Sequence, residues 1–239
     1  IFTGIPGTGK GLFVHKILKP LFGELQTPMR SLENIEEHFN LYMRTAMFLV
    51  VDEFRMADSG SVGKMADKLK NQITEPNLTI RAMRTNQIEL PSFTNFIFLT
   101  NRADAVKIED SDRRYNVAPR QEQKIEHVHP ELLDNLSALE PELYIIAGVL
   151  EKFKVDQRMA HTALENDAKK EMKEVSMSVL EEFANAIRTR NLEYFTEVLD
   201  IPLTNTFDAG GISTAQRYLK DWLANAEEEQ IIPLAHFKI

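Results

Sequence analysis

The sequence contains no cysteine, which excludes disulfides, zinc knuckles and thiol nucleophiles. It also has no apolar run near the roughly 18 residues of a membrane span, and no charged and apolar leader. We therefore expect no membrane segment and a cytoplasmic location. With 239 residues, 43% of them hydrophobic, the chain is long enough to bury a full core in one or two domains.

Glycine is scarce as well, with 10 in the whole chain, yet residues 4–11 read Gly-Ile-Pro-Gly-Thr-Gly-Lys-Gly. An apolar start precedes this stretch, and a helix-like apolar run follows it. The spacing is typical of a phosphate-binding loop, in which backbone N–H groups surround an anion and a lysine adds a positive charge. The alternative is a tight strand-to-helix turn that needs glycines for its backbone geometry alone. The predicted contacts to a nucleoside triphosphate are Gly4, Pro6, Gly7, Thr8, Gly9, Lys10, Gly11 and Leu12.

The loop lacks one group that such loops normally contain. Residue 11 is glycine, where serine or threonine would offer a hydroxyl to Mg²⁺. The metal must then depend more on water, the nucleotide and distant carboxylates. The Thr8 hydroxyl is a candidate substitute.

A second predicted strand ends in two acids. Residues 47–51 form a continuous apolar run, typical of a strand buried on both faces, and Asp52 and Glu53 follow it directly. Because ligands of open α/β sheets bind at the carboxyl ends of strands, both carboxylates are expected to face the phosphates. Asp52 would orient Mg²⁺ through water, and Glu53 would polarise the attacking water as a general base. The alternative is a strand that ends in solvated acids.

A third predicted strand, over residues 93–100, ends at Asn101. An amide at this place can hydrogen-bond both a γ-phosphate and the attacking water, although asparagine is also a common turn former. Farther along stand Asp112, Arg113 and Arg114. These charges form either an ordinary surface ion pair or the source of an arginine that a neighbouring protomer offers to the phosphoryl group. The sequence does not rank the two arginines.

The order of these motifs resembles that of the superfamily 3 helicases: Gly-Thr-Gly-Lys-Gly, then Leu-Val-Val-Asp-Glu, a basic stretch, Phe-Ile-Phe-Leu-Thr-Asn and Ser-Asp-Arg-Arg-Tyr. The resemblance is stronger to the helicase region of phage, plasmid and virus primase-helicases and primase-polymerases, and it covers residues 1 to about 120. It implies an α/β fold: an AAA+-like P-loop NTPase core with a parallel sheet and flanking helices. It also implies ATP and Mg²⁺ as cofactors and a ring, commonly a hexamer, that moves 3′-to-5′ on single-stranded DNA.

The resemblance also assigns roles to individual residues. Lys10 takes the place of the phosphate lysine, and Asp52 and Glu53 take those of the magnesium and water-activating acids. Asn101 corresponds to the first sensor, and Arg113 or Arg114 to the arginine finger. Gly11 departs from the usual motif, although a glycine there also occurs among phage members.

The stretch between the acid strand and the asparagine strand is expected to contact DNA in such a family. Between residues 64 and 84, five basic residues outweigh two acidic ones, a local formal charge of +3 in a chain of net charge −8. Residues at four-residue steps predict a helix with one buried face and outward lysines, followed by a hairpin that turns at residues 85–87. The alternative is a solvated basic face. The candidate DNA-binding residues are Lys64, Lys68, Lys70, Arg81 and Arg84.

Residues 121–239 show mainly helical periodicity, with Pro141 as a predicted break and a small terminal module predicted from about residue 201. Only three residues precede the loop, so we expect a piece of a longer chain that is truncated within its first strand. In relatives a primase or polymerase domain lies upstream. The pattern therefore predicts an ATP-dependent DNA helicase motor. The alternatives are an AAA+ initiator or loader that uses ATP as a switch, and a non-catalytic oligomerisation and DNA-binding module.

Overall fold

The computed structural model describes residues 1–60, 62–84, 86–109, 111–160, 162–177, 179–189 and 194. The chain forms two compact units, Ile1–Ser176 and Met177–Ile239. The first unit has the mixed α/β architecture with a parallel sheet that the sequence predicts. In the second unit, the described part includes helix α10 (Val179–Thr189). The terminal module predicted from about residue 201 lies outside the described residues.

The first unit is organised around four parallel strands in the order β1-β6-β3-β2. Their bounds are β1 (Phe2–Thr3), β2 (Met29–Arg30), β3 (Phe48–Val51) and β6 (Asn95–Thr100). The two apolar runs predicted as strands are confirmed as β3 and β6. Strand β6 begins at Asn95, two residues later than predicted, and Phe93 lies in the link before it with 78% of its surface exposed. The order places β6 between the loop strand and the acid strand.

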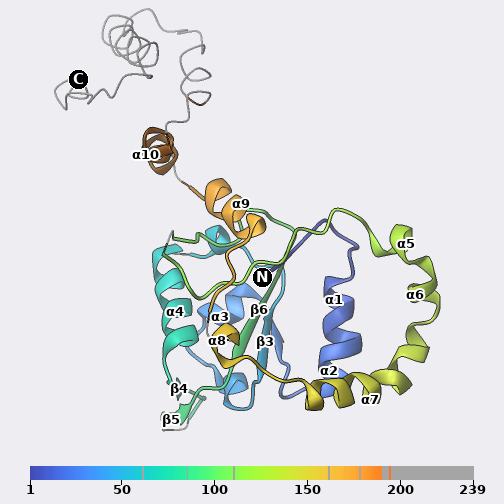
Figure 1. The fold of residues 1–239 in the computed structure, drawn as a ribbon. Coiled ribbons are helices and arrows are strands. Elements are labelled where there is room, and N and C mark those ends of the chain that lie inside the picture. Colours follow the sequence, from blue (N-terminus) through green and yellow to red (C-terminus); the bar gives the residue numbers. More distant parts are fainter. Residues whose placement is uncertain are drawn as a thin grey trace, which may run out of the picture. The chain divides into compact units, whose positions relative to one another are not determined.

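Helices cover both faces of this sheet (Figure 1). Alternate residues of β3 face opposite sides, since Leu49 and Val51 belong to a large apolar cluster and Val50 to a smaller one. Helix α4 (Val62–Thr74) contributes Leu69 to the large cluster, and the helical run after the glycine-rich loop contributes Val14 to the small one. The apolar strands are thus buried on both faces, as parallel strands generally are.

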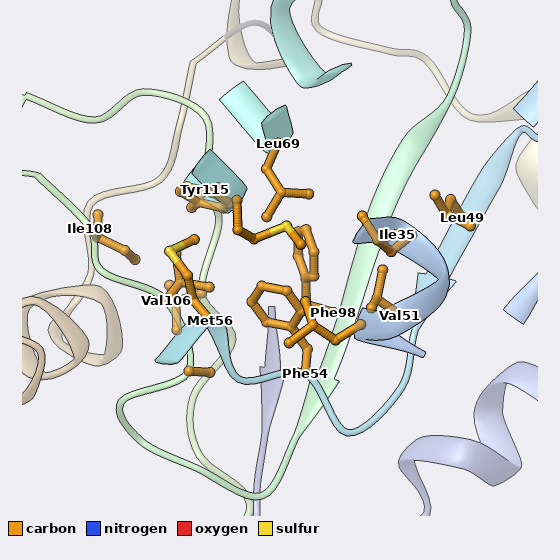
Figure 2. Close-up of a cluster of buried hydrophobic side chains, with 14 of the residues drawn as sticks. Ile35, Leu49, Val51, Phe54, Met56, Leu69, Phe98, Val106, Ile108 and Tyr115 are labelled. Carbon is orange, nitrogen blue, oxygen red and sulfur yellow. The ribbon is translucent and has the colours of Figure 1, made fainter. Parts of the chain in front are cut away.

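The large cluster lies directly under the turn that follows β3. Phe54 and Phe98 are 0% and 2% exposed, and their ring centroids are 4.6 Å apart. Figure 2 shows the two rings near the centre of the cluster, with Leu69 of α4 close by. The Phe54 N–H also donates to the Leu99 carbonyl at 2.9 Å. Side-chain packing and a backbone hydrogen bond therefore both fix the turn that contains the acids.

The run after the loop is one continuous helical segment with a wide turn in its middle. It comprises α1 (Lys10–Phe13), the π-helical turn η1 (Val14–Leu18) and α2 (Lys19–Phe22). Pro20 stands at the start of α2 and has no N–H to donate to the preceding turn. A locally widened helix accommodates such a residue.

Residues 116–121 extend the sheet beyond β1. Ala118 N donates to Ile1 O at 2.9 Å, Gln121 N to Thr3 O at 3.0 Å and Ile5 N to Gln121 O at 3.0 Å. A parallel bridge joins Gly4 to Gln121. The domain boundary predicted near residue 120 falls inside the first compact unit, Ile1–Ser176. The segment around it is hydrogen-bonded along the loop strand.

The basic stretch folds as a helix and a hairpin, as the sequence predicts. In α4, Met65 and Leu69 are buried and Ile73 packs against the same cluster. The hairpin pairs β4 (Asn77–Ile80) with β5 (Ile88–Pro91) in antiparallel register. Strand β4 is shorter than the predicted run, so Arg81 and Arg84 lie in the connection between the strands.

Short elements fill the remaining connections in this half of the unit. They are the helix α3 (Leu32–Glu36) and the two 3₁₀ turns η2 (Leu41–Arg44) and η3 (Met56–Asp58).

Helices dominate the later part of the first unit. They are α5 (Ile125–Val128), α6 (Pro130–Asp134), α7 (Leu136–Lys152), α8 (Gln157–Ala160) and α9 (Asp167–Val175). The predicted break at Pro141 is wrong, since α7 continues through it. The proline lies within the first two turns, where only a few intrahelical hydrogen bonds are affected. Within the described residues, no helix is both long and apolar enough to cross a bilayer.

Candidate functional site

The glycine-rich loop links β1 to α1 and adopts a conformation that needs glycine at two points. Gly7 and Gly9 have φ values of 86° and 87°, a backbone region that side chains with a Cβ disfavour. At Gly4 the constraint is space, because an added Cβ would lie 2.7 Å from the Gln121 Cβ. Residues 4–9 therefore form one tight turn after the strand, and Lys10, Gly11 and Leu12 lie in α1.

Lys10 folds back over this loop. Its ammonium group donates to Gly4 O at 3.0 Å, to Ile5 O at 3.1 Å and to Thr8 Oγ1 at 3.1 Å. All three donors of the ammonium group are thus bound to oxygens of the loop itself. Two backbone carbonyls and one side-chain hydroxyl thus hold the cation over the loop.

The two acids stand where β3 ends. The Asp52 N–H donates to Arg30 O at 3.0 Å, and Asp52 Oδ1 accepts the Glu53 N–H at 3.0 Å. Glu53 has a φ of 51°, an uncommon value for a residue with a side chain, and its side chain is exposed. Strained backbone of this kind persists where the surrounding structure fixes it, often at functional sites. Together with Arg30 and Asn34, the acids line a cavity of about 580 Å³.

The topology brings the three strand ends to one edge of the sheet. Because β1, β6 and β3 are adjacent and parallel, Asn101 follows the strand that lies between the loop and the acids. Electrostatics agrees with this proximity. Burial and the Arg120 guanidinium lower the pKa of Lys10, whereas Asp52 acts in the opposite direction and raises it. Lys10, Asp52 and Asn101, drawn from separate segments, therefore share this edge, which we call the loop edge.

Arg120 is a residue of the loop edge that the sequence did not indicate. Its Nη1 and Nη2 donate to Asn101 O at 3.3 and 3.4 Å, and its Nε forms an ion pair with Glu122 at 2.7 Å. No sequence pattern points to Arg120, because it lies in a connector without apolar periodicity. Only the hydrogen bonds of residues 116–121 along β1 bring it to this edge.

The two adjacent arginines have different environments. Arg114 donates from Nε and Nη2 to Asp112 Oδ2 at 3.0 and 2.9 Å, and Asp112 is 6% exposed. The buried Lys169 of α9 also donates to Asp112 O at 2.9 Å. Arg113, in contrast, is exposed. The structure therefore fastens Arg114 inside its own chain and leaves the Arg113 side chain at the surface.

The predicted DNA-binding residues are also unequal. Lys68, expected to point outward, is half-buried, and its ammonium group donates to Glu36 O at 3.1 Å and Glu37 O at 2.9 Å. These carbonyls lie at the end of α3, where backbone acceptors lack helical partners. The other four candidates, Lys64, Lys70, Arg81 and Arg84, are exposed. We call the segment from α4 through β5 the basic arm.

The residues available for a metal are few. Within the described residues, no three or more histidine, cysteine, aspartate or glutamate side chains form a group suited to a metal ion. Gly11 offers no hydroxyl, and the Thr8 hydroxyl already accepts a hydrogen bond from Lys10. Asp52 keeps one carboxylate oxygen beyond the one that accepts the Glu53 N–H. This donor set suits a hydrated Mg²⁺ that is also bound by a nucleotide, rather than a cage made of protein alone.

The chain is similar to one protein family and to one curated phage protein. Residues 2–114 match the model of a protein family described as a family of unknown function, DUF5906. The chain is 32% identical over 203 residues to the DNA primase-polymerase of Nitratiruptor phage NrS-1. The aligned region covers 82% of this chain and 27% of that protein.

Solved structures agree with this similarity. An apo structure of the NrS-1 C-terminal region superposes with a TM-score of 0.72 at 27% identity, and covers 91% of this chain and 52% of that one. An A-form apo structure of the same region gives a TM-score of 0.69 at 26% identity, and covers 92% and 52%. The chain thus spans about half of those solved chains and about a quarter of the curated relative. It is homologous to the C-terminal region of a phage DNA primase-polymerase.

Proposed function

We propose that the chain is the ATP-driven DNA helicase motor of a phage replication protein of the primase-polymerase type. One observation supports this above the others: the parallel order β1-β6-β3 brings the loop lysine, Asp52 and Asn101 to one edge of the sheet. Ligands of open parallel sheets bind at this edge. The NrS-1 relative, a primase-polymerase by name, favours a role in DNA replication.

The phosphates would bind in the glycine-rich loop. Backbone N–H groups of the turn around Gly7 and Gly9 surround the anion, and Lys10 adds a full charge at the β/γ end. On binding, the Lys10 ammonium exchanges its three loop oxygens for phosphate oxygens. This exchange costs little reorganisation, because the ammonium group already lies over the loop.

The remaining groups would act on the terminal phosphate. Bound Mg²⁺ would neutralise charge on the phosphates, and Asp52 would hold it through water. Glu53, exposed and fixed in its strained turn, takes a proton from the attacking water. Asn101 hydrogen-bonds the terminal phosphate, and an arginine from the neighbouring protomer of a ring, commonly a hexamer, stabilises developing charge. Arg113 is the better candidate, because Arg114 is bound to Asp112.

The basic arm would couple this cycle to single-stranded DNA. Arg81 and Arg84 stand at the exposed end of a hairpin, where they can neutralise backbone phosphates. Asn40 fastens the base of this connection, since its Oδ1 accepts from Arg81 N at 2.7 Å and its Nδ2 donates to Thr79 O at 3.0 Å. Movement of the segment around Asn40 would therefore move the hairpin. The 3′-to-5′ direction, the cytoplasmic location in a host cell and an upstream primase or polymerase domain belong to the same proposal.

A second function has one observation in its favour. Gly11 lacks the hydroxyl that loops of this kind use for Mg²⁺. A chain with impaired metal binding would serve as an oligomerisation and DNA-gripping module, or as an initiator that uses ATP only as a switch. Hydrolysis stimulated by single-stranded DNA would exclude the non-catalytic module. Strand displacement on forked DNA would exclude the initiator.

The decisive experiment compares Lys10→Ala with Glu53→Gln. Lys10→Ala removes phosphate binding, so both nucleotide affinity and hydrolysis are lost. Glu53→Gln keeps binding and lowers hydrolysis by at least about 100-fold, since a general base contributes this much or more. Hydrolysis is measured as phosphate release, and binding by equilibrium dialysis of labelled ATP.

The matched control is Lys16→Ala, which removes an exposed lysine of the same helical run. This variant is expected to keep the wild-type rate of phosphate release. Unchanged phosphate release in either the Lys10 or the Glu53 variant would refute the assignment.

A further inference from the structure

Arg120 lies beside the loop strand in space. Its neighbour Gln121 is bridged to Gly4 at the start of the glycine-rich loop, and Gln121 N donates to Thr3 O at 3.0 Å. The backbone of Arg120 is therefore held next to the end of β1 by the same hydrogen bonds that extend the sheet. A substitution of the side chain leaves these backbone bonds in place.

The guanidinium group reaches the end of the neighbouring strand β6. Both Nη atoms share the Asn101 carbonyl at 3.3 and 3.4 Å, which are long and weak contacts for a charged donor. The strong contact is the 2.7 Å ion pair with Glu122, whose side chain is 63% exposed. Three of the five guanidinium N–H groups at most are used in these contacts, so donors remain for a further acceptor.

Lys10 and Arg120 bring two positive charges to the same edge. Burial and Arg120 both lower the pKa of Lys10, which means that the two cations are close enough to repel each other. Asp52 offsets this only in part. An anion placed between the two cations would relieve the repulsion and gain from both.

The geometry points to Arg120 as a phosphate-sensing residue of the same subunit, which contacts the terminal phosphate of a nucleoside triphosphate beside Asn101. This role rests on the proposed nucleotide site and adds a second cation to it. When the triphosphate binds, the guanidinium exchanges Glu122 and the long Asn101 contacts for phosphate oxygens. A diphosphate lacks the group that reaches Arg120, so Glu122 keeps its partner.

This exchange makes the site prefer a triphosphate over a diphosphate. It also links the terminal phosphate to residues 116–121, and so to the segment that leads into α5 over the loop. Ile125 N donates to Gly7 O at 3.0 Å, which fastens α5 to the loop. The state of the nucleotide is thereby transmitted to this connector through the Arg120 side chain.

The test measures the affinities of ATP and ADP for the wild type and for Arg120→Ala by equilibrium dialysis of labelled nucleotides. The expected result is a loss of about tenfold or more for ATP, since a charge-assisted contact to phosphate is among the strong hydrogen bonds. For ADP the expected change is below about twofold, because the Lys10 contacts remain. Arg120→Lys keeps the charge and retains part of the preference for ATP.

Two further variants sharpen the result. Arg158→Ala removes an exposed arginine of α8 and keeps the wild-type ratio of the two affinities. Glu122→Gln weakens the competing ion pair and leaves ATP affinity equal or higher. If Arg120→Ala does not fold, as judged by its thermal unfolding, Arg120→Lys and Glu122→Gln decide.

Equal losses for ATP and ADP in Arg120→Ala, or no loss for either, would overturn the role of Arg120 while the nucleotide site stands. If the wild type bound neither nucleotide, the proposed site itself would be wrong, and the role of Arg120 would fall with it. The two failures are therefore distinguishable in one series of measurements.

Discussion

The loop edge and the basic arm hold their cations in opposite ways. At the loop edge, Lys10 and Arg120 are bound to oxygens of their own chain, and Arg120 lowers the pKa of Lys10. In the basic arm, Arg81 and Arg84 are exposed at the end of a hairpin. Lys68 is the exception in the arm, because it is bound to the carbonyls of Glu36 and Glu37.

This difference matches two kinds of anion. A small ligand such as a triphosphate is bound best by charges that are already in position, because little entropy is then lost on binding. A polymer backbone offers many equivalent phosphates, so exposed cations at a surface are sufficient for it. The fixed cations of the loop edge therefore suit a small anion, and the exposed cations of the basic arm suit a strand.

The largest expected effect separates the two adjacent arginines, of which Arg113 is exposed and Arg114 is bound to Asp112. Arg113→Ala removes an exposed cation, and we expect hydrolysis to fall by about 10³-fold with unchanged thermal unfolding, as for a trans-acting arginine. Arg114→Ala leaves Asp112, which is 6% exposed, as a buried charge without its partner, and costs about 3 kcal/mol of stability. Phosphate release and urea unfolding of both variants are the measurements.

The trans action of Arg113 has its own control. Mixing Arg113→Ala protein with Lys10→Ala protein creates some interfaces in which both missing groups are present, so part of the hydrolysis returns. Two inactive proteins that stay inactive after mixing would place the whole site in one subunit. A stability loss in Arg113→Ala as large as in Arg114→Ala would contradict the distinction between fixed and exposed arginines.

The next effect tests the basic arm. Arg81→Ala with Arg84→Ala should weaken single-stranded DNA binding by about tenfold and reduce the salt slope by about 1.4, which is about 0.7 per phosphate contact. Lys68→Ala should leave DNA affinity unchanged and cost about 1 kcal/mol of stability, the value of its hydrogen bonds. Fluorescence anisotropy at several salt concentrations, with urea unfolding, makes the comparison.

The hydrolysis rate without DNA is the internal control, and the double variant should retain it. DNA affinity that falls equally in Lys68→Ala and in the double variant would show that the contacts of Lys68 in this structure do not decide its role.

The sequence predicts the loop edge well because strand ends follow from local patterns. The apolar runs before Asp52 and Asn101 become β3 and β6, and the parallel order brings their ends together. Arg120 and Lys68 could not be placed in this way. Their partners lie 19 and about 31 positions away along the chain, and a helical pattern says only which face is buried, not which carbonyl a long side chain reaches.

The smallest effect examines the fixed side of the comparison. Tyr115 directly follows Arg114 and is buried, and burial, then Asp112, raises its pKa from 10.0 to about 12, while Arg114 opposes this. Between these two pH values the folded state keeps the phenol proton that the unfolded chain loses. The contribution of Tyr115 to the free energy of unfolding is therefore fully present below about pH 10 and is lost as the pH rises through about 12.

We expect wild-type protein to lose about 1 kcal/mol more than Tyr115→Phe between about pH 9 and pH 11, measured by urea unfolding. Tyr144→Phe changes a tyrosine that is 73% exposed and should keep the wild-type pH dependence. If Tyr115→Phe lost as much stability as the wild type, residues 112–115 would open to solvent more than their buried contacts indicate. Arg114 would then be no more fixed than Arg113, and the distinction on which the choice of the trans arginine depends would fail.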